Sequence, residues 1–193
     1  MSRRWFIAIP LDESHKDAFA RFRKHHTSAF RDVPQLKKVR WIDPEKLHIT
    51  GLFLGDVEDE KQQAVQEAVQ KVAQQTQPFH LHLHTCIFAQ ESRKPRMIWA
   101  RFHNNHDFTH FHFSLREQIG HHLTLEEAPK EPIPHVTLAR FKPFRNNNQV
   151  DLRQTEMPQL ALTVEHCEIW CSERHQEGAY YRTVRSFQLG SDK

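Results

Sequence analysis

The stretch Leu47-His48-Ile49-Thr50-Gly51-Leu52 has a near-copy, Pro134-His135-Val136-Thr137-Leu138, in the other half of the chain. In an extended strand, side chains two positions apart point to the same face, so each copy would present an imidazole and a hydroxyl group to one surface. Two such strands lying side by side would bring two histidines and two threonines around one small anion. The repeated stretch therefore predicts one site built from both halves of the chain.

The His-x-Thr triplet alone carries little information, because in a chain of 193 residues with 16 His about one such triplet is expected by chance. Four occur, beginning at His25, His48, His122 and His135. The triplet at His25 closes a stretch whose phenylalanines recur at helical spacing, where positions two apart do not share a face. Only the copies at His48 and His135 combine a preceding turn proline with a continuing apolar strand, although His122 remains a rival.

These residue types suit displacement at phosphorus, in which the attacking and leaving oxygens lie in line on opposite sides. Such a reaction needs a base on one side and an acid on the other, and histidine can serve as either near neutral pH. The hydroxyl groups of Thr50 and Thr137 can donate hydrogen bonds to the non-bridging oxygens, where charge grows in the transition state. We therefore expect phosphodiester chemistry with His48 and His135 as the acid and base pair.

Several further blocks of sequence occur around the two copies. They are Phe6-Ile7-Ala8-Ile9-Pro10-Leu11, Val39-Arg40-Trp41, Pro44-Glu45-Lys46, Phe53-Leu54-Gly55, Met97-Ile98-Trp99, Ala139-Arg140 and Gly178-Ala179-Tyr180-Tyr181. In content and order, the chain resembles the two-histidine (2H) phosphoesterases with their HXTX motifs, and within them the bacterial RNA 2',3'-cyclic phosphodiesterases, also called 2'-5' RNA ligase-like proteins. Two positions depart from the family pattern: Gly51 replaces a larger residue, and the usual phenylalanine before Pro134 is missing.

The resemblance implies an α+β fold of two pseudo-symmetric lobes, with antiparallel sheets lining a central cleft and helices on the outside. Residues 1–193 would then form a single bilobal domain. It also implies metal-independent hydrolysis of RNA 2',3'-cyclic phosphate ends to 2'-phosphomonoesters, with a weak reverse 2'-5' ligation. In this scheme His48 is the proton donor to the leaving ribose oxygen, His135 accepts a proton from water, and Thr50 and Thr137 assist.

The partners expected from this resemblance are RNA ends or short oligonucleotides that carry a 2',3'-cyclic phosphate, with no cofactor, no metal and no obligatory protein partner. Three alternatives stay open from the sequence. The chain could be an RNA-end-binding module of the same fold in which hydrolysis is incidental, or a phosphodiesterase for a small cyclic phosphate. It could also be a metal hydrolase built on the alternating histidines His80, His82 and His84.

The composition agrees with a globular protein that binds an anion. A net charge of +3 is too small for the dense basic stripe of a protein held to nucleic acid by backbone charge alone, so contact with an RNA terminus is expected. The hydrophobic content of 38%, with 14 Phe, supplies a core, and no apolar run is long enough for a membrane span or signal peptide. Three cysteines argue against a disulfide scaffold, so we expect a cytoplasmic protein.

Hydrophobic periodicity predicts alternating strands and helices. The predicted strands cover residues 5–9, 39–42, 48–54, 79–87, 96–102, 135–140, 160–170 and 180–189. The predicted helices cover residues 12–26, 58–75 and 108–119, and polar loops are expected around Ser92 and over 145–149. The first helix would be capped by Asp12.

Some residues have competing interpretations. His80, His82 and His84 share a strand face and could chelate a metal, but the lack of nearby acidic or cysteine ligands favours a polar face in solvent. Cys167 and Cys171 are expected to be buried thiols for a similar reason.

The histidines of residues 103–112 are expected on the solvent-facing side of the last helix. Strict alternation points Arg140 away from the site, and only a bulge or a strand end could return it to bind phosphate. Trp41, Phe53 and Tyr180 could stack on a base or belong to the core.

Overall fold

The computed structural model describes residues 2–30, 36, 38–89, 95–143, 152, 160–175 and 178–190. Two predicted polar loops, around Ser92 and over 145–149, lie outside the described residues. In chain order the elements are β1 (Ser2–Pro10), α1 (Glu13–Ala29), β2 (Arg40–Trp41), η3 (Pro44–Lys46), β3 (His48–Glu58), η4 (Asp59–Lys61), α2 (Gln62–Gln75), β4 (Phe79–Ala89), β5 (Met97–Phe102), α3 (His106–Gly120), β6 (His135–Arg140), β7 (Ala161–Val164), β8 (His166–His175) and β9 (Gly178–Gln188).

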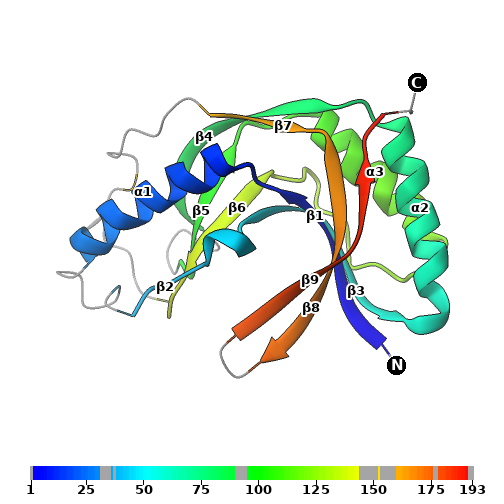
Figure 1. The fold of residues 1–193 in the computed structure, drawn as a ribbon, viewed down its shortest axis with the longest axis horizontal. Helices are drawn as coiled ribbons and strands as arrows, with labels where there is room; N and C mark the ends of the chain where they lie inside the picture. Colours follow the sequence, from blue (N-terminus) through cyan, green and yellow to red (C-terminus); the bar gives the residue numbers. More distant parts are fainter. Residues whose placement is uncertain are drawn as a thin grey trace.

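The described strands pair in the order β7-β4-β5-β6-β3-β1-β8-β9, with β2 paired to β6, and every pairing is antiparallel. The two central strands β3 and β6 are joined at only one register pair, Ile49 with Val136. Figure 1 shows the two halves of the sheet diverging from this junction. The predicted α+β fold, with antiparallel strands and helices on the outside, is confirmed.

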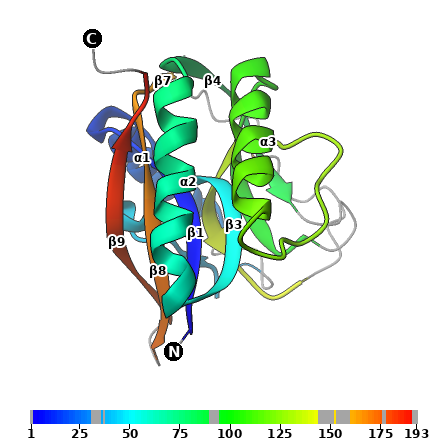
Figure 2. The same ribbon diagram turned by 90° about the vertical axis from the view of Figure 1, so that its right-hand side faces the viewer.

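The helices cover the outer faces of the two halves. In Figure 2, α2 and α3 lie side by side, and both contact strands of the half that contains β3, β8 and β9. Helix α1 packs on the other half, where the Phe22 ring meets the edge of Trp41 in β2 and the His15 ring stacks on Phe102 in β5. As predicted, Asp12 caps α1, because its side chain accepts a hydrogen bond from the backbone N–H of His15.

Two predicted elements differ from the structure. The helix predicted over 58–75 begins only at Gln62, because β3 continues to Glu58 and the 3-10 turn η4 follows it. The strand predicted over 160–170 is two strands separated at Glu165. These two strands lie far apart in the strand order, since β7 pairs with β4 whereas β8 lies between β1 and β9.

The cysteines and the histidines of β4 lie where the sequence predicted. Cys86, Cys167 and Cys171 are free and buried, and burial raises the pKa of Cys86 and Cys167 to about 12. The side chains of His80, His82 and His84 are exposed. Within the described part of the chain, no group of three or more His, Cys, Asp or Glu side chains could hold a metal ion. No helix in the same part has both the length and the apolar character of a membrane span.

Candidate active site

The four side chains predicted to form one site line a single cavity of about 640 Å³. The paired residues Ile49 and Val136 are completely buried, so their neighbours on each strand face the opposite side of the sheet. Those neighbours are His48, Thr50, His135 and Thr137. Because β3 and β6 are antiparallel, this register sets the imidazole of each motif beside the hydroxyl group of the other motif.

The two imidazoles are held in the same way. The Nδ1 atom of His48 lies 2.8 Å from the carbonyl oxygen of Lys46, and Nδ1 of His135 lies 2.8 Å from the carbonyl oxygen of Ile133. A carbonyl oxygen can only accept, so Nδ1 must carry the proton in both rings. The Nε2 atom of each ring is therefore left to accept or donate a proton.

The rings differ in their surroundings. His48 lies among three aromatic side chains, with ring centroids 5.0 Å from Phe6, 4.9 Å from Trp170 and 5.5 Å from Tyr181. His135 instead stacks on Trp99, with 3.8 Å between ring centroids. Each imidazole thus packs against aromatic side chains, in a different arrangement for His48 than for His135.

Burial is the main influence on the charge state of both histidines. It lowers the pKa of His48 to about 4, with smaller contributions from the positive charges of His135 and Arg140. Burial and Arg140 likewise lower the pKa of His135. The hydrogen bonds from Nδ1 to the backbone act in the opposite direction. Both imidazoles are thus neutral near pH 7, and a bound anion would raise their pKa values.

Arg140 lines the cavity, so strict alternation is wrong here, and the alternative that a bulge returns this side chain to the site is confirmed. In the pairing of β5 with β6, Ile98 pairs with Ala139 but Trp99 pairs with Thr137, which leaves Leu138 as an extra residue in β6. This β-bulge interrupts the alternation, and the two consecutive residues 138 and 139 are both buried. The next side chain, Arg140, consequently returns to the cavity face.

The first motif contains a bulge at the same place. Ile7 pairs with Leu52 and Ala8 pairs with Thr50, so Gly51 is the extra residue of β3. The side chain that returns to the cavity is Phe53, which is 63% exposed. The two strands thus share one pattern of burial over six residues, His48–Phe53 and His135–Arg140.

His112 is a residue of this region that the sequence did not reveal. It was expected on the solvent-facing side of α3, but only 7% of it is exposed and its Nδ1 donates to the carbonyl oxygen of Gly51 over 2.7 Å. A Cβ atom at Gly51 would lie 3.3 Å from the Phe111 ring, so glycine allows α3 to approach the bulge closely. The departure from the family pattern at Gly51 was the signal that could have indicated this contact.

The remaining candidates lie elsewhere. His25 lies in α1, and His122 is exposed in the turn after α3 and lines neither cavity at the motifs. Trp41 stacks on Phe30 and packs against the core, and Tyr180 does not line the cavity. Of the three aromatic candidates for base stacking, only Phe53 lies in the cavity.

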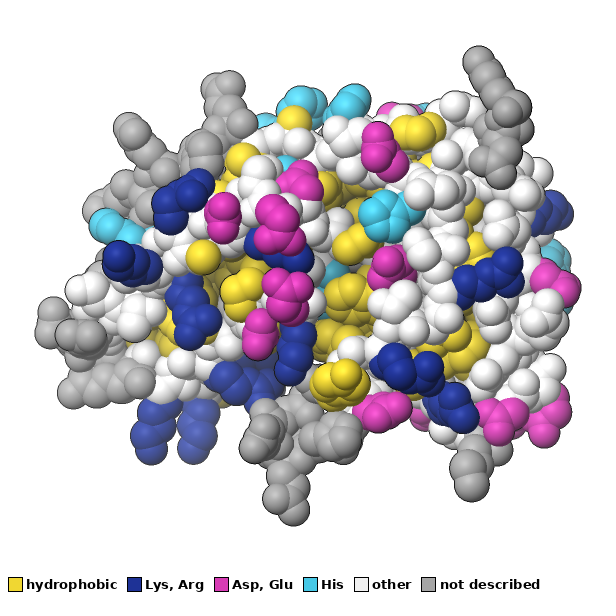
Figure 3. Space-filling model, viewed as in Figure 1, with side chains coloured by type: hydrophobic (Ala, Val, Ile, Leu, Met, Phe, Trp, Pro, Cys, Tyr) yellow, Lys and Arg dark blue, Asp and Glu magenta, His cyan; other side chains and the backbone are white. Residues whose placement is uncertain are grey.

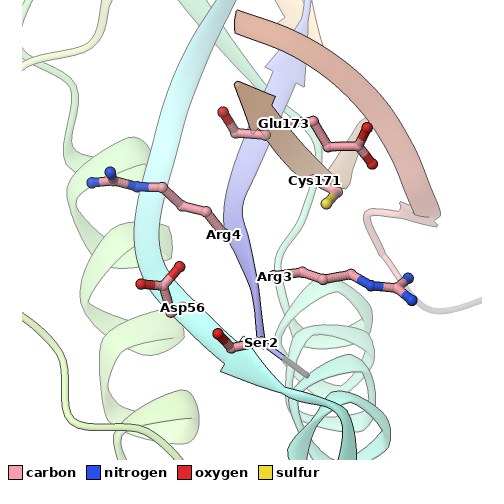
Figure 4. A pocket seen from close by; sticks show the side chains of 7 residues that line it. Ser2, Arg3, Arg4, Asp56, Cys171 and Glu173 are labelled. Carbon is pink, nitrogen blue, oxygen red and sulfur yellow. The ribbon is translucent and has the colours of Figure 1, made fainter. Parts of the chain in front are cut away.

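A second concave region, of about 490 Å³, lies at the start of β1 (Figure 4). In Figure 4 the side chains of Arg3 and Arg4 extend to opposite sides of this strand. Asp56 and Glu173 contribute as many negative charges as the arginines contribute positive ones. None of the four predicted residues lines this region, so we assign the site to the 640 Å³ cavity.

The charge of the 640 Å³ cavity suits an anion. Arg4, Lys46 and Arg140 line it, and no carboxylate is found among its described lining residues. On the face of the molecule shown in Figure 3, basic and acidic side chains are interspersed rather than gathered in one stripe. This distribution suits contact with a short anionic group more than a long nucleic-acid groove.

Comparisons with known proteins agree with the fold and the motifs. Residues 11–176 match the model of the 2'-5' RNA ligase superfamily. Proteins named RNA 2',3'-cyclic phosphodiesterase from Methanothermobacter thermautotrophicus and Thermotoga maritima are 25% and 23% identical to this chain. The first comparison covers 98% of this chain and 100% of the relative, and the second covers 96% and 95%.

Solved structures show the same fold. E. coli LigT complexed with 3'-AMP superposes with a TM-score of 0.77 at 20% identity, covering 98% of this chain and 99% of that one. TT0787 of Thermus thermophilus also gives a TM-score of 0.77, at 23% identity over 98% of this chain and all of that one. With the family match over residues 11–176, the chain belongs to the 2'-5' RNA ligase superfamily, a family of two-histidine phosphoesterases.

Proposed function

We propose that this protein is an RNA 2',3'-cyclic phosphodiesterase that opens the cyclic phosphate to a 2'-phosphomonoester without a metal. The observation that carries the proposal is the pair of imidazoles, each fixed by a backbone carbonyl, in one cationic cavity. The curated relatives named RNA 2',3'-cyclic phosphodiesterase support the same reaction.

In the proposed reaction, His135 Nε2 takes a proton from water while His48 Nε2 protonates the leaving ribose oxygen. This assignment of acid and base follows the resemblance to the two-histidine phosphoesterases. Thr50 and Thr137 donate hydrogen bonds to the non-bridging oxygens, and Arg140 balances their charge. The five-membered ring of the substrate is strained, so no metal is needed to activate it.

The same site would also support a weak and reversible ligation, in which a 5'-hydroxyl group attacks the cyclic phosphate and forms a 2'-5' linkage. Attack that forms this linkage must expel the 3'-oxygen. Water in the place of the hydroxyl group would expel the same oxygen, so hydrolysis should leave a 2'-phosphate and a free 3'-hydroxyl group. His48 would then lie beside the 3'-oxygen.

The proposed partners are RNA ends or short oligonucleotides, since only Arg4, Lys46 and Arg140 supply positive charge to the cavity. We further propose that residues 1–193 act as one bilobal domain, because His48 and His135 come from opposite halves of the sheet. Neither half contains the acid and base pair alone.

The test is incubation of the protein with a short RNA ending in 2',3'-cyclic phosphate, with and without EDTA. We expect full activity in EDTA, with the product co-migrating with a 2'-phosphate standard in chromatography. Binding without turnover would favour an RNA-end-binding module. Loss of activity on chelation, restored by Zn²⁺, would favour a metal hydrolase on the His80 strand.

Products must also be compared for a 2',3'-cyclic mononucleotide. Turnover of the mononucleotide but not of the RNA would identify a small cyclic phosphate as the substrate. A predominant 3'-phosphate from the RNA would contradict the proposed leaving group and the ligation geometry derived from it.

A further inference from the structure

The three basic side chains of the 640 Å³ catalytic cavity come from opposite ends of the strands that form it. Lys46 precedes β3, and Arg140 pairs with Arg40 of β2, so both lie on the side where β3 begins. Arg4 instead pairs with Asp56, near the end of β3. A nucleic-acid chain that leaves the catalytic histidines toward the end of β3 would therefore meet Arg4 and neither of the other two cations.

The backbone of β1 directs the Arg4 side chain to the cavity. Pairing with β8 is regular from Arg4 to Ala8, so side chains alternate between the two faces of β1. Phe6 faces His48, whereas Trp5 belongs to the main core. Arg4 shares the face of Phe6 and lines the cavity.

The neighbouring arginine has a different orientation. Arg3 does not line the cavity, and Figure 4 shows Arg3 and Arg4 extending to opposite sides of β1. Both side chains are exposed. The two positions thus carry the same charge on adjacent residues, but only Arg4 faces the proposed substrate.

Arg4 lies too far from the catalytic threonines to bind the cyclic phosphate itself. Thr50 pairs with Ala8, four residues from Arg4 along β1. At about 3.4 Å per residue, the two positions are separated by about 14 Å. The cavity between them is lined by aromatic rings, among them Phe6 and Tyr181 with centroids 5.3 Å apart. Such a surface suits a nucleotide of a single strand, whose next phosphate would then come within reach of Arg4.

The charge changes sign beyond Arg4. Arg4 and Ser172 line both the catalytic cavity and the 490 Å³ region at the start of β1, so the two spaces adjoin. Asp56 and Glu173 line only the second of them. Within the described residues Arg4 has no ion pair, so its charge is available to a ligand. Carboxylates repel phosphate, so the path that suits a phosphate chain ends at Arg4.

We propose that Arg4 binds an internucleotide phosphate on the 5' side of the cyclic end, and that the protein therefore prefers a short oligonucleotide to a cyclic mononucleotide. The inference rests on the proposed function, because the cyclic phosphate occupies the same cavity. A mononucleotide ends before Arg4, whereas one or two further nucleotides supply the phosphate that Arg4 binds. Nucleotides beyond these meet the acidic region and add no further contact.

The first test compares a mono-, di-, tri- and hexanucleotide that all end in the same 2',3'-cyclic phosphate, with the complete protein. We expect kcat/KM to rise by about three- to tenfold from mononucleotide to trinucleotide, and by less than about twofold from trinucleotide to hexanucleotide. A trinucleotide with neutral methylphosphonate linkages should lose this gain, because its bases can stack but it carries no internucleotide charge.

The outcomes separate the inference from the proposed function. Hydrolysis at the same kcat/KM for every length would overturn the inference and leave the proposed function standing. A gain that persists with methylphosphonate linkages would also overturn it, since stacking would then account for the preference. Hydrolysis of none of these substrates would overturn the proposed function and the inference with it.

Arg4→Gln and Arg3→Gln are matched variants, because each removes one positive charge from an adjacent position of β1. The measured quantity is the ratio of kcat/KM for the trinucleotide to kcat/KM for the mononucleotide. Arg4→Gln should lower this ratio by about three- to tenfold, Arg4→Lys should restore part of it, and Arg3→Gln should leave it unchanged. A purely structural role of Arg4 would lower both kcat/KM values equally. An unchanged ratio in Arg4→Gln, or an equal decrease in Arg3→Gln, would overturn the assignment to Arg4.

Discussion

The two catalytic candidates share their backbone contact but not their neighbours, because His48 lies among aromatic rings and His135 stacks on one. We expect His48→Ala and His135→Ala each to lower kcat for a 2',3'-cyclic substrate by at least about a hundredfold. The double variant should have a kcat only slightly lower than that of either single variant, because the losses from removing an acid and a base that act in the same step are not additive. Initial rates measured by product chromatography test this.

The matched control is His122→Ala, which removes the rival triplet from an exposed turn and should be nearly silent. A severe loss in this variant, together with a mild loss in His135→Ala, would show that the wrong pair of motifs has been assigned.

The positive charge of Arg140 is expected to influence the pH dependence of the reaction through the two histidines. Its positive charge contributes to the lowered pKa of both His48 and His135. In the free enzyme, kcat/KM should therefore peak below the ordinary histidine pKa and fall as the pH rises, since the acid loses its proton. Arg140→Gln should raise both pKa values and move both limbs of the kcat/KM profile to higher pH.

The same substitution should raise KM, because a charge that faces the substrate phosphate is lost. Arg185→Gln removes a charge from β9 outside the cavity and should leave the profile in place. If Arg140→Gln changed KM but not the pH profile, Arg140 would bind the substrate without influencing the histidines.

At the level of elements, the sequence predicts the periodic features and misses those set by pairing. Alternation in β3 and β6 correctly grouped each histidine with its threonine. The bulges at Gly51 and Leu138 depend on the partner strands β1 and β5, so the sequence of the bulged strand alone does not encode them. For the same reason, helical periodicity predicts which residues share a face of α3, but it does not predict the hydrogen bond from His112 to the Gly51 carbonyl of β3.

A glycine inside β3, next to a second bulge of this strand, gives a prediction for stability. Gly55 has φ of 73°, a conformation that strains any residue with a Cβ atom. We expect Gly55→Ala to lower the free energy of unfolding by about 1–2 kcal/mol. Gly120, the last residue of α3, has no positive φ and no atom within 4 Å of an added Cβ. Gly120→Ala should leave the free energy of unfolding unchanged or raise it. Equal decreases for the two variants in urea denaturation would contradict a role of the positive φ at Gly55.

On the scale of the whole molecule, the site exists because two halves of one sheet meet at the pair Ile49 and Val136. The motif repeat predicted this joining of halves. It could not predict that the chain leaves β7 at one end of the strand order and enters β8 between β1 and β9, because such long-range pairing leaves no local pattern. For this reason the sequence predicted one strand over 160–170 where the structure has two, β7 and β8.

Buried histidines also make the stability of the whole protein depend on pH. Burial lowers the pKa of His26, His48, His112 and His135 in the folded state. The unfolded chain therefore binds more protons as the pH falls below about 6.5, and the free energy of unfolding decreases. Each extra proton bound contributes a slope of about 1.4 kcal/mol per pH unit. For His48 this loss continues down to its folded pKa of about 4.

Urea midpoints measured from pH 7.5 to 4.5 should accordingly fall most steeply below pH 6.5. His26 is buried in α1 outside the catalytic cavity, so His26→Gln removes one of the titrating groups without touching the proposed chemistry. This variant should be less stable at pH 7.5 and should show a shallower fall toward pH 4.5. His121→Gln, at an exposed position, should reproduce the original pH dependence. A fall that is equally steep in all three proteins would assign the acid sensitivity to groups other than His26, and a flat profile in the original protein would contradict the neutral state of the four buried rings.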